Sequence, residues 1–238
     1  MEAYVRHYDI HLEASFVAVS ADAKEMGIGM LGLREERAWI TRLGIMPDQR
    51  GHNVGQLLVN KLIETAREKS ITRIQLEVIE ANIPGHRLFL KVGFEEVRRL
   101  LVIQRSPGDV NDALNFEITQ MKTDEIRACL AARLPGASWI EETASLFKLE
   151  HLIGLRVRLP SGAAGWIVFS ETLSQLSHLV FSGEDKSIAL ALLHAVHHQY
   201  PRHETQVENL PVNSPLWPIF QRVGYVESFR RIEMRLLL

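Results

Sequence analysis

The sequence predicts an α/β protein made of two related halves, and three observations lead to this fold class. The stretch from Trp39 to Ile45 is rich in β-forming residues, and after a short glycine-containing turn the apolar residues from Gln56 to Lys69 recur at helical spacing. Strand and helix patterns then alternate to the end of the 238 residues. Finally, the segment around Asn82 recurs around Asn213, at an offset of 131 residues.

The first half is expected to begin with a weak helical stripe over Met1–Ala14. A charged hairpin over Arg34–Arg37 joins its second and third strands, and Gly93 ends its last helix. The expected strands are Phe16–Ser20, Gly27–Leu33, Ala38–Ile45, Arg73–Ile79 and Phe94–Gln104. The expected helices are Gln56–Lys69 and Pro84–Val92.

The segment Ser106–Asp109 has the composition of a linker, and the second half follows it. Thr123 is the expected N-cap of the first helix there, and Asp124 and Glu125 lie in its first turn. The expected helices are Thr123–Leu134, Ser138–Phe147, Ser187–His198 and Leu216–Val223. The expected strands are Phe116–Gln120, His151–Leu159, Ala164–Ser170, Leu176–Phe181, Thr205–Leu210 and Tyr225–Leu237.

The turn between Ile45 and Gln56 offers backbone groups to an anion. Gly51 and Gly55 let N–H groups face outward without a Cβ in the way. The N–H groups of a first helical turn have no intrahelical partner, and the helix dipole adds positive charge there. The turn can therefore hold a phosphate or pyrophosphate, with Arg50 as a cation beside it. The glycine spacing fits neither the dinucleotide fingerprint nor a P-loop, and a turn that binds nothing is the alternative.

Two motifs of the first half resemble those of the GNAT superfamily of N-acetyltransferases. Arg50, Asn53 and Gly55 occupy the positions of its motif A, Gln/Arg-x-x-Gly-x-Gly/Ala. Asn53 replaces the middle glycine, and asparagine tolerates left-handed backbone better than other residues. The run from Asn82 to Phe94 resembles its motif B, Asn-x-x-Ala-x-x-Leu-Tyr-x-x-x-Gly-Phe. The resemblance covers Ser15 to Arg105.

This resemblance implies a tandem GNAT fold, in which each half is a mixed, mainly antiparallel α/β sheet. It implies an acetyl-CoA-binding domain over residues 1–105, a linker over 106–114 and a degenerate GNAT-like domain over 115–238. The superfamily's opening strand and most of its first two helices are missing before Ser15. We therefore expect either that another segment covers that edge or that the domain is trimmed.

The resemblance also implies where acetyl-CoA binds. The pantetheine arm would pair with the strand at Leu43, Gly44 and Ile45, whose backbone amides could support an oxyanion. Asn82 would hydrogen-bond the pantetheine region, and Phe89 of motif B is counted with the cofactor-binding residues. The pyrophosphate would lie on the turn and the helix start, which consist of Arg50, Gly51, His52, Asn53, Val54, Gly55 and Gln56.

Acetyl transfer to an amine needs a base for the amine and a proton donor for the departing thiolate. Glu77 lies where some family members place the base. The alternative is a structural carboxylate on the strand, and Glu208 at the corresponding place in the second half favours this alternative. Phe89 stands where the family has a tyrosine acid, and phenylalanine cannot donate a proton. His86 is the candidate replacement, against the alternatives of a surface histidine or of water as the acid.

The second half differs from the first where a cofactor would bind. At the same offset, the turn Arg50–Gly55 corresponds to Phe181–Lys186, which has one glycine and the carboxylates Glu184 and Asp185. Carboxylates suit a helix start but repel a phosphate. We expect this half to be structural or substrate-shaping and to bind no cofactor.

Composition excludes several other classes of protein. A net charge of -2 gives no reason to expect nucleic acid or an anionic membrane as partner, and the single Cys129 excludes an internal disulfide. No apolar run reaches the ~20 residues of a membrane span, and the start has no secretory signal, so a cytoplasmic protein is predicted. His194, His197 and His198 have metal-like spacing, but without an acidic partner we expect a polar helix face and no metal.

The predicted function is acetyl-CoA-dependent N-acetyltransfer to a primary amine of a small molecule or peptide. A non-catalytic acyl-CoA-binding or regulatory protein is the competing hypothesis, because the family's tyrosine and one motif A glycine are replaced. Aminoacyl transfer from charged tRNA, known among tandem GNAT proteins, is a third hypothesis. It is disfavoured because the chain has no excess of basic residues. The sequence leaves the acceptor and a homodimer open.

Overall fold

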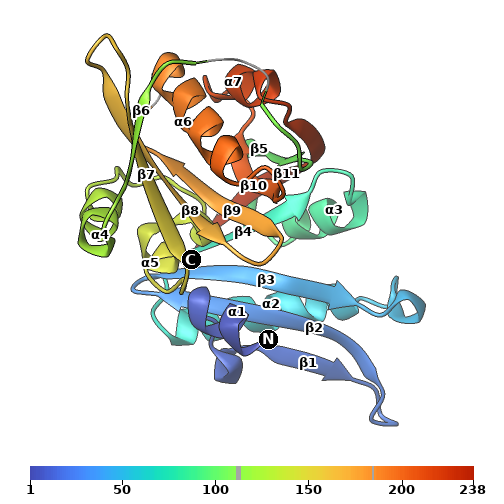
Figure 1. Cartoon of the computed structure of the whole chain (residues 1–238). Helices are drawn as coiled ribbons and strands as arrows, with labels where there is room; N and C mark the ends of the chain where they lie inside the picture. The colour runs from blue at the N-terminus through green and yellow to red at the C-terminus, as the bar shows by residue number, and fades with distance from the viewer. Residues whose placement is uncertain (111–113, 184) are drawn as a thin grey trace. The chain divides into compact units, whose positions relative to one another are not determined.

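The computed structural model describes residues 1–110, 114–183 and 185–238, and it divides into two compact units (Figure 1). Unit 1 comprises Met1–Arg99 together with Arg231–Leu238, and unit 2 comprises Leu100–Arg230. The units therefore do not coincide with the two halves of the sequence. Residues 231–238 of the second half belong to unit 1, and residues 100–105 of the first half belong to unit 2. Of the predicted linker, residues 111–113 lie outside the described part of the chain.

Unit 1 begins with two short helices in place of the predicted weak helical stripe, and alternating strands and helices follow. The short helices are α1 (Glu2–His7) and a 3₁₀ turn over Leu12–Ala14. The strands are β1 (Phe16–Val19), β2 (Glu25–Arg34), β3 (Arg37–Ile45), β4 (Arg73–Ile79), the start of β5 (Glu95–Arg105) and the end of β11 (Val226–Leu237). The longer helices are α2 (Val54–Glu68) and α3 (Ile83–Lys91).

The sheet of unit 1 is mixed and mainly antiparallel. Strands β1, β2 and β3 form an antiparallel meander, β3 and β4 are parallel, and β4 pairs antiparallel with the end of β11. The parallel pair needs a crossover, which α2 supplies. Alternate residues of these strands pack with α2 in one core. Its buried residues include Leu31, Ala38, Ile40, Val59, Leu62, Ile74, Leu76, Val78, Phe89, Phe94, Ile232 and Met234.

Unit 2 repeats this plan with more elements. Its helices are α4 (Thr123–Ala131), a 3₁₀ turn over Trp139–Glu141, α5 (Thr143–Leu146), α6 (Lys186–Gln199) and α7 (Trp217–Arg222). Its own strands are β6 (Glu117–Gln120), β7 (Leu152–Arg158), β8 (Ala164–Glu171), β9 (Gln175–Phe181) and β10 (Glu204–Pro211). The end of β5 pairs antiparallel with β10, β10 and β9 are parallel, and β9, β8, β7 and β6 are antiparallel neighbours.

Two predictions about the secondary structure of the second half are wrong. The helix predicted over Ser138–Phe147 is broken into the 3₁₀ turn and α5, because Glu142 between them has an extended backbone, with φ -64° and ψ 148°. Thr123 is the first helical residue and Lys122 is the N-cap; the Glu125 carboxylate accepts the backbone N–H of Lys122 at 2.8 Å, which is one half of a capping box.

Candidate functional site

The two parallel strands of unit 1 pair over only a short length. Strands β3 and β4 are in register from Arg37 opposite Arg73 to Trp39 opposite Gln75. Strand β3 stays paired with β2 on its other side as far as Ile45. The two parallel strands therefore diverge beyond Trp39. Beyond Trp39, β3 presents backbone N–H and C=O groups on the side that β4 leaves. An extended ligand arm could pair with these groups as a neighbouring strand would.

A β-bulge reorients β3 inside this divergent part. Between Thr41 and Gly44, β3 has the two residues Arg42 and Leu43 where β2 has only Gly29. Arg42 has a φ of 51°, in the left-handed region that bulges use. A bulge of this kind re-aims backbone amides, and it lies at Leu43 and Gly44, two of the residues predicted to support an oxyanion.

The predicted anion-binding turn ends at Asn53, which is the N-cap residue of α2. Asn53 is left-handed, with φ 61° and ψ 7°, as the replacement of glycine by asparagine allows, and Gly51 has a φ of 82°. The Asn53 side chain makes no capping hydrogen bond to its helix. The backbone N–H of Leu57 donates to the Asn53 carbonyl at 3.0 Å. The N–H groups of residues 54–56 lie before this bond, at the helix start, where backbone N–H groups have no partner within the helix.

Gly51 and Gly55 have different roles. A Cβ on Gly51 would meet nothing within 4 Å, so this part of the turn is open. A Cβ on Gly55 would lie 3.1 Å from Leu88 of α3 and 3.6 Å from Ile45 of β3. Gly55 therefore lets the first turn of α2 pack closely against the strand end and against α3, which brings the helix start beside the divergent part of β3.

Cationic side chains lie around the start of α2. The Nε of exposed Arg50 donates to the Ile45 carbonyl at 3.4 Å. His52 is exposed in the same turn. From the end of α3, the Nζ of Lys91 donates to Oε1 of Gln56 at 2.8 Å, which holds an ammonium group at the first turn of α2. The helix dipole, Arg50 and Lys91 all favour an anion there.

Asn82 has a clear local role at the start of α3. It is the N-cap residue, and its Oδ1 accepts the backbone N–H of Gly85 at 3.1 Å. A Cβ on Gly85 would lie 2.6 Å from Nδ2 of Asn82. An alanine at this position would therefore require the Asn82 side chain to move.

Glu77, the candidate base, lies on the face of the sheet away from α2. Its neighbours Leu76 and Val78 point into the core, and its own Oε2 accepts the indole N–H of Trp39 at 2.7 Å. Across the antiparallel pair, Glu77 faces Glu233 of β11, whose Oε2 accepts from the Nε of Arg98 at 2.5 Å. Half-buried Glu77 thus stands where β3 and β4 cease to pair, beside a second, buried carboxylate.

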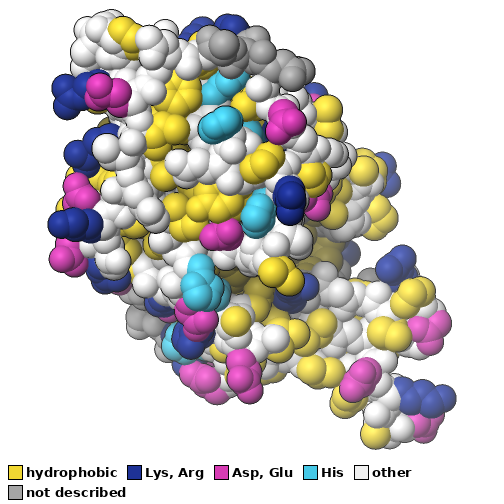
Figure 2. Space-filling view, viewed as in Figure 1, with side chains coloured by type: hydrophobic (Ala, Val, Ile, Leu, Met, Phe, Trp, Pro, Cys, Tyr) yellow, Lys and Arg dark blue, Asp and Glu magenta, His cyan; other side chains and the backbone are white. Residues whose placement is uncertain are grey.

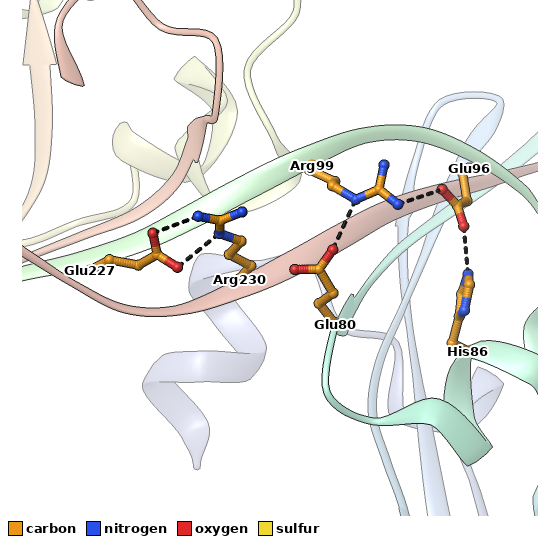
Figure 3. A network of polar contacts seen from close by, with 6 residues as sticks. All are labelled: Glu80, His86, Glu96, Arg99, Glu227 and Arg230. Atoms are coloured by element: carbon orange, nitrogen blue, oxygen red, sulfur yellow. Dashed lines mark hydrogen bonds and ion pairs between the residues drawn. The ribbon is translucent and has the colours of Figure 1, made fainter. Parts of the chain in front are cut away.

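His86 and Phe89 lie elsewhere on α3. Phe89 is 5% exposed and packs in the core against Phe94, with ring centroids 5.6 Å apart. The Nε2 of His86 lies 2.8 Å from Oε1 of Glu96. Figure 3 shows this pair continuing through Arg99, which contacts Glu96 and donates to Glu80 at 2.8 Å. His86 therefore belongs to a surface network of carboxylates and an arginine.

Sequence reasoning missed the contribution of α1. The hydroxyl of Tyr4 is hydrogen-bonded to Oγ1 of Thr41 at 2.6 Å, and the guanidinium of Arg42 lies 4.4 Å from the centre of its ring. The ring of Tyr8 packs against Trp39, with centroids 5.9 Å apart. The signal was present, since Tyr4 and Tyr8 are spaced four apart within the weak helical stripe, but nothing local indicated which strand they contact.

Unit 2 repeats the divergence and the bulge without the open helix start. Strands β9 and β10 are paired at Gln175–Leu176 only, and His178 has a φ of 56° where β9 bulges. Helix α6 begins at Lys186, and its N-cap residue Asp185 accepts the N–H of Ile188 on its own carboxylate at 2.8 Å. The helix start that would face a phosphate is thus occupied by a negative charge. The second predicted carboxylate, Glu184, lies outside the described residues.

The 3₁₀ turn of unit 2 bridges its divergent strands. Oγ of Ser138 accepts from Nδ2 of Asn209 on β10 at 3.0 Å, and Oε1 of Glu141 lies 3.0 Å from Nδ1 of His178 on β9. Burial alone would lower the pKa of His178, but the Glu141 carboxylate and the charge of Glu208 outweigh it and raise the pKa. The turn therefore ties β9 to β10 through buried polar contacts.

The histidines of α6 do not form the predicted polar face. His194 is 5% exposed and His197 is fully buried, whereas His198 is exposed. Burial, together with the charge of Arg105, lowers the pKa of His197 to about 3, and its Nε2 lies 3.1 Å from the Tyr225 hydroxyl. Within the described residues, no three His, Cys, Asp or Glu side chains gather as metal ligands, and no helix has the length and apolarity to span a membrane.

Comparisons with known proteins agree with this fold. Residues 1–94 match the model of the Acetyltransferase (GNAT) family. A curated relative from Haemophilus influenzae, a [ribosomal protein bS18]-alanine N-acetyltransferase, is 37% identical over 62 residues, which are 26% of this chain. The chain spans 42% of that relative's length, and 54% and 43% of the lengths of two further curated relatives.

Solved structures resemble nearly the whole chain. A GCN5-related N-acetyltransferase from Sphaerobacter thermophilus has a TM-score of 0.71 at 16% identity, over 93% of this chain and 79% of that one. A tandem GNAT protein from the clavulanic acid biosynthesis pathway has a TM-score of 0.65 at 16% identity, over 94% and 82%. At such identities the likeness concerns the fold, and it confirms the predicted fold class.

Proposed function

We propose that this chain transfers an acetyl group from acetyl-CoA to a primary amine. The premise is that residues 1–94 match the GNAT acetyltransferase family and that the chain has a tandem GNAT fold. The reaction is assigned to unit 1. The observation that carries the proposal is the start of α2, which has no capping side-chain bond from Asn53 and lies beside the divergent strands β3 and β4.

The residues of unit 1 fit the cofactor in shape and in charge. Its phosphates would lie at the N–H groups of residues 54–56, where Gly51 leaves open space and Arg50 and Lys91 add positive charge. Its pantetheine arm would pair with β3 at residues 43–45, on the side that β4 leaves. Asn82 would add its side-chain amide, although its Oδ1 already caps α3. Phe89 is buried, so only a small part of its ring would reach the cofactor.

The chain's own groups suit acetyl transfer. Acetyl-CoA supplies the reactive thioester when bound. Glu77 would accept the proton of the attacking amine, and the backbone amides at the bulge would stabilise negative charge on the carbonyl oxygen. The Trp39 indole N–H holds the Glu77 carboxylate at the point where the two strands separate.

Unit 2 is proposed to bind no acetyl-CoA. The Asp185 carboxylate caps α6 from within, so a phosphate at that helix start would meet a like charge. Unit 2 would then have a structural or substrate-shaping role. A cytoplasmic location and a homodimer remain predictions.

The acceptor is proposed to be an amine of a peptide or of a small molecule. The relative from Haemophilus influenzae is named for a protein alanine, so peptides with a free N-terminal amine are the first acceptors to test. Transfer from charged tRNA remains disfavoured by the net charge of -2. On the face shown in Figure 2, basic and acidic side chains are interspersed and form no single positive area.

Calorimetric titration of the full chain with acetyl-CoA tests the proposal, with one equivalent expected. Arg50→Glu should weaken binding by ~1–3 kcal/mol, because it removes a charge-assisted contact and adds repulsion. Asp185→Asn is the control and should leave binding unchanged. Two equivalents, or full affinity in a folded Arg50→Glu variant, would contradict the site.

Thiol release with a panel of amines then separates an enzyme from a binding protein. Turnover with an N-terminal peptide amine or a small amine is the expected result. Tight binding of acetyl-CoA without turnover across both kinds of acceptor would favour the acyl-CoA-binding or regulatory alternative.

A further inference from the structure

The motif residue Phe89 leaves acetyl transfer without an obvious proton donor. The departing thiolate needs a proton, and a phenylalanine ring in the core cannot supply one. His86, the other candidate on α3, has its Nε2 against Glu96 in the surface network of Figure 3. A donor has to be sought on another element that reaches the divergent strands.

Helix α1 brings a hydroxyl group to this place. Tyr4 is half-buried, and its hydroxyl lies 2.6 Å from Oγ1 of Thr41. Thr41 is the last residue of β3 paired with β2 before the bulge at Arg42 and Leu43. The Arg42 guanidinium covers the Tyr4 ring at 4.4 Å and holds it over the strand. The phenol is thus anchored beside the bulge amides that would face the thioester carbonyl.

The phenol and the candidate base lie on the same face of the sheet. On β3, Ala38 and Ile40 point into the core with α2, so Trp39 and Thr41 point to the opposite face. Trp39 donates to Glu77 at 2.7 Å, which puts that carboxylate on this face too. The phenol and the carboxylate therefore lie on one face of the sheet, held by Thr41 and Trp39 of β3 near the point where β3 and β4 separate.

We propose that Tyr4 is the proton donor of the reaction, an inference that rests on the proposed function of unit 1. Tyr4 gives its hydroxyl proton to the thiolate sulfur as the carbon–sulfur bond breaks, and the new carbon–nitrogen bond forms as the amine loses a proton to Glu77. The Tyr4 phenolate then takes a proton from solvent and Glu77 releases one, so that no net proton is gained or lost by the chain. Thr41 orients the Tyr4 hydroxyl between turnovers.

Replacing Tyr4 by phenylalanine tests this role. Tyr4→Phe should lower kcat ~10²-fold or more and remove the basic limb of the pH–rate profile, while the dissociation constant for acetyl-CoA changes less than ~2-fold. Tyr8→Phe, in the same helix and aromatic cluster, is the matched control and should keep both limbs. Thr41→Val should lower kcat less than Tyr4→Phe, because the donor remains.

A second measurement needs no acceptor. A phenol that donates to the sulfur stabilises a bound thiolate and so lowers the pKa of the thiol. In Tyr4→Phe, the pKa of the thiol of bound coenzyme A should therefore rise by ~1 unit, as measured by the ultraviolet absorption of the thiolate. The same titration in Tyr8→Phe should match the wild type. An unchanged thiol pKa together with an unchanged pH–rate profile in folded Tyr4→Phe would leave α1 with an anchoring role only, and water would be the acid.

The two proposals fail in different ways. If the wild-type chain does not bind coenzyme A, the proposed function and the role of Tyr4 both fall. If coenzyme A binds and its thiol titrates identically with and without the Tyr4 hydroxyl, only the assignment of Tyr4 is overturned.

Discussion

Single carboxylates in the two units are held by different neighbours. Glu77 accepts from Trp39 and faces Glu233 across the strand pair, and two like charges directly opposite destabilise a sheet unless other groups compensate them. Arg98 donates to both carboxylate oxygens of Glu233 and so compensates this charge. Glu208, at the corresponding place in the second half, instead contributes to the charge around His178. The same residue type therefore has a candidate catalytic role in one unit and an electrostatic role in the other.

Glu77→Gln is expected to lower turnover by ~10²–10⁴-fold and to leave acetyl-CoA affinity nearly unchanged. The glutamine keeps an oxygen for the Trp39 N–H, so the fold should persist. Steady-state kinetics over a range of pH should also lose the acidic limb. Glu208→Gln is the matched control and should keep full turnover. Equal losses of stability in both variants with normal turnover would make this glutamate a structural residue of the repeat.

The buried pair of His178 and Glu141 predicts a pH dependence of stability. Burial disfavours the charged ring, but the Glu141 and Glu208 charges outweigh it, so the pKa of His178 is raised in the folded chain. The stabilisation is fully present below the unfolded pKa of ~6.5 and is lost as the pH rises through the folded value. Denaturant unfolding of wild type and His178→Gln should differ most near pH ~6 and least near pH ~9. A difference that grows with pH would refute this assignment.

The two units differ in how the helices at their corresponding positions begin. Helix α2 begins at a left-handed Asn53 without a capping side-chain bond, whereas α6 begins at Asp185, whose carboxylate caps it. Helix α3 begins at Asn82, which caps Gly85. A helix whose own side chain satisfies its first N–H groups needs no ligand there, and one without such a cap can take an anion. For the two corresponding helices, this contrast favours the proposed cofactor site at α2 over one at α6.

Gly85→Ala tests how tightly the cap of α3 is built. The new Cβ would lie 2.6 Å from Nδ2 of Asn82, so the side chain must move and its bond to residue 85 weakens. We expect a loss of ~0.5–2 kcal/mol in denaturant unfolding, the range of a lost cap. Asn82→Ala is the reference for complete loss of the cap. An alanine variant as stable as the wild type would show that Asn82 adjusts at no cost.

The whole molecule is built by exchanging strands between the halves of the sequence. The end of β11 pairs with β4 and places Ile232 and Met234 in the core of unit 1, and the end of β5 pairs with β10 in unit 2. Each compact unit therefore contains residues from both halves. Cutting the chain between the halves would remove a strand from each sheet, so the fold around the proposed cofactor site depends on the end of β11.

Met234→Ala should destabilise unit 1 although the residue lies far along the chain from the proposed site. Met234 is fully buried, and truncating such a residue costs ~2–5 kcal/mol. Hydrogen exchange should rise in β4, to which Met234 is paired through Leu76. Arg235→Ala, at the adjacent exposed position, should change stability by less than ~0.5 kcal/mol. Normal protection of β4 in Met234→Ala would mean that β11 does not complete this sheet in solution.

The sequence by itself determined the elements and the chemistry that local patterns encode. Strand β4 was predicted with its observed bounds, Arg73–Ile79, and α2 within two residues of its observed start. The left-handed backbone observed at Asn53 is one that its residue type tolerates, which can be read from the sequence at the replaced motif A glycine. These features depend on neighbours within a few positions, so they can be read without knowing the fold.

Only the tertiary structure decided which distant residues meet. The sequence pattern of β11 predicts a strand but not its partner β4, since alternating apolar residues fit either sheet. His194 and His197 look polar in sequence and lie in a core, because α6 is covered on most of its faces. Tyr4 reaches Thr41 across 37 positions. Such contacts depend on chain packing over long separations, which local propensity and periodicity do not encode.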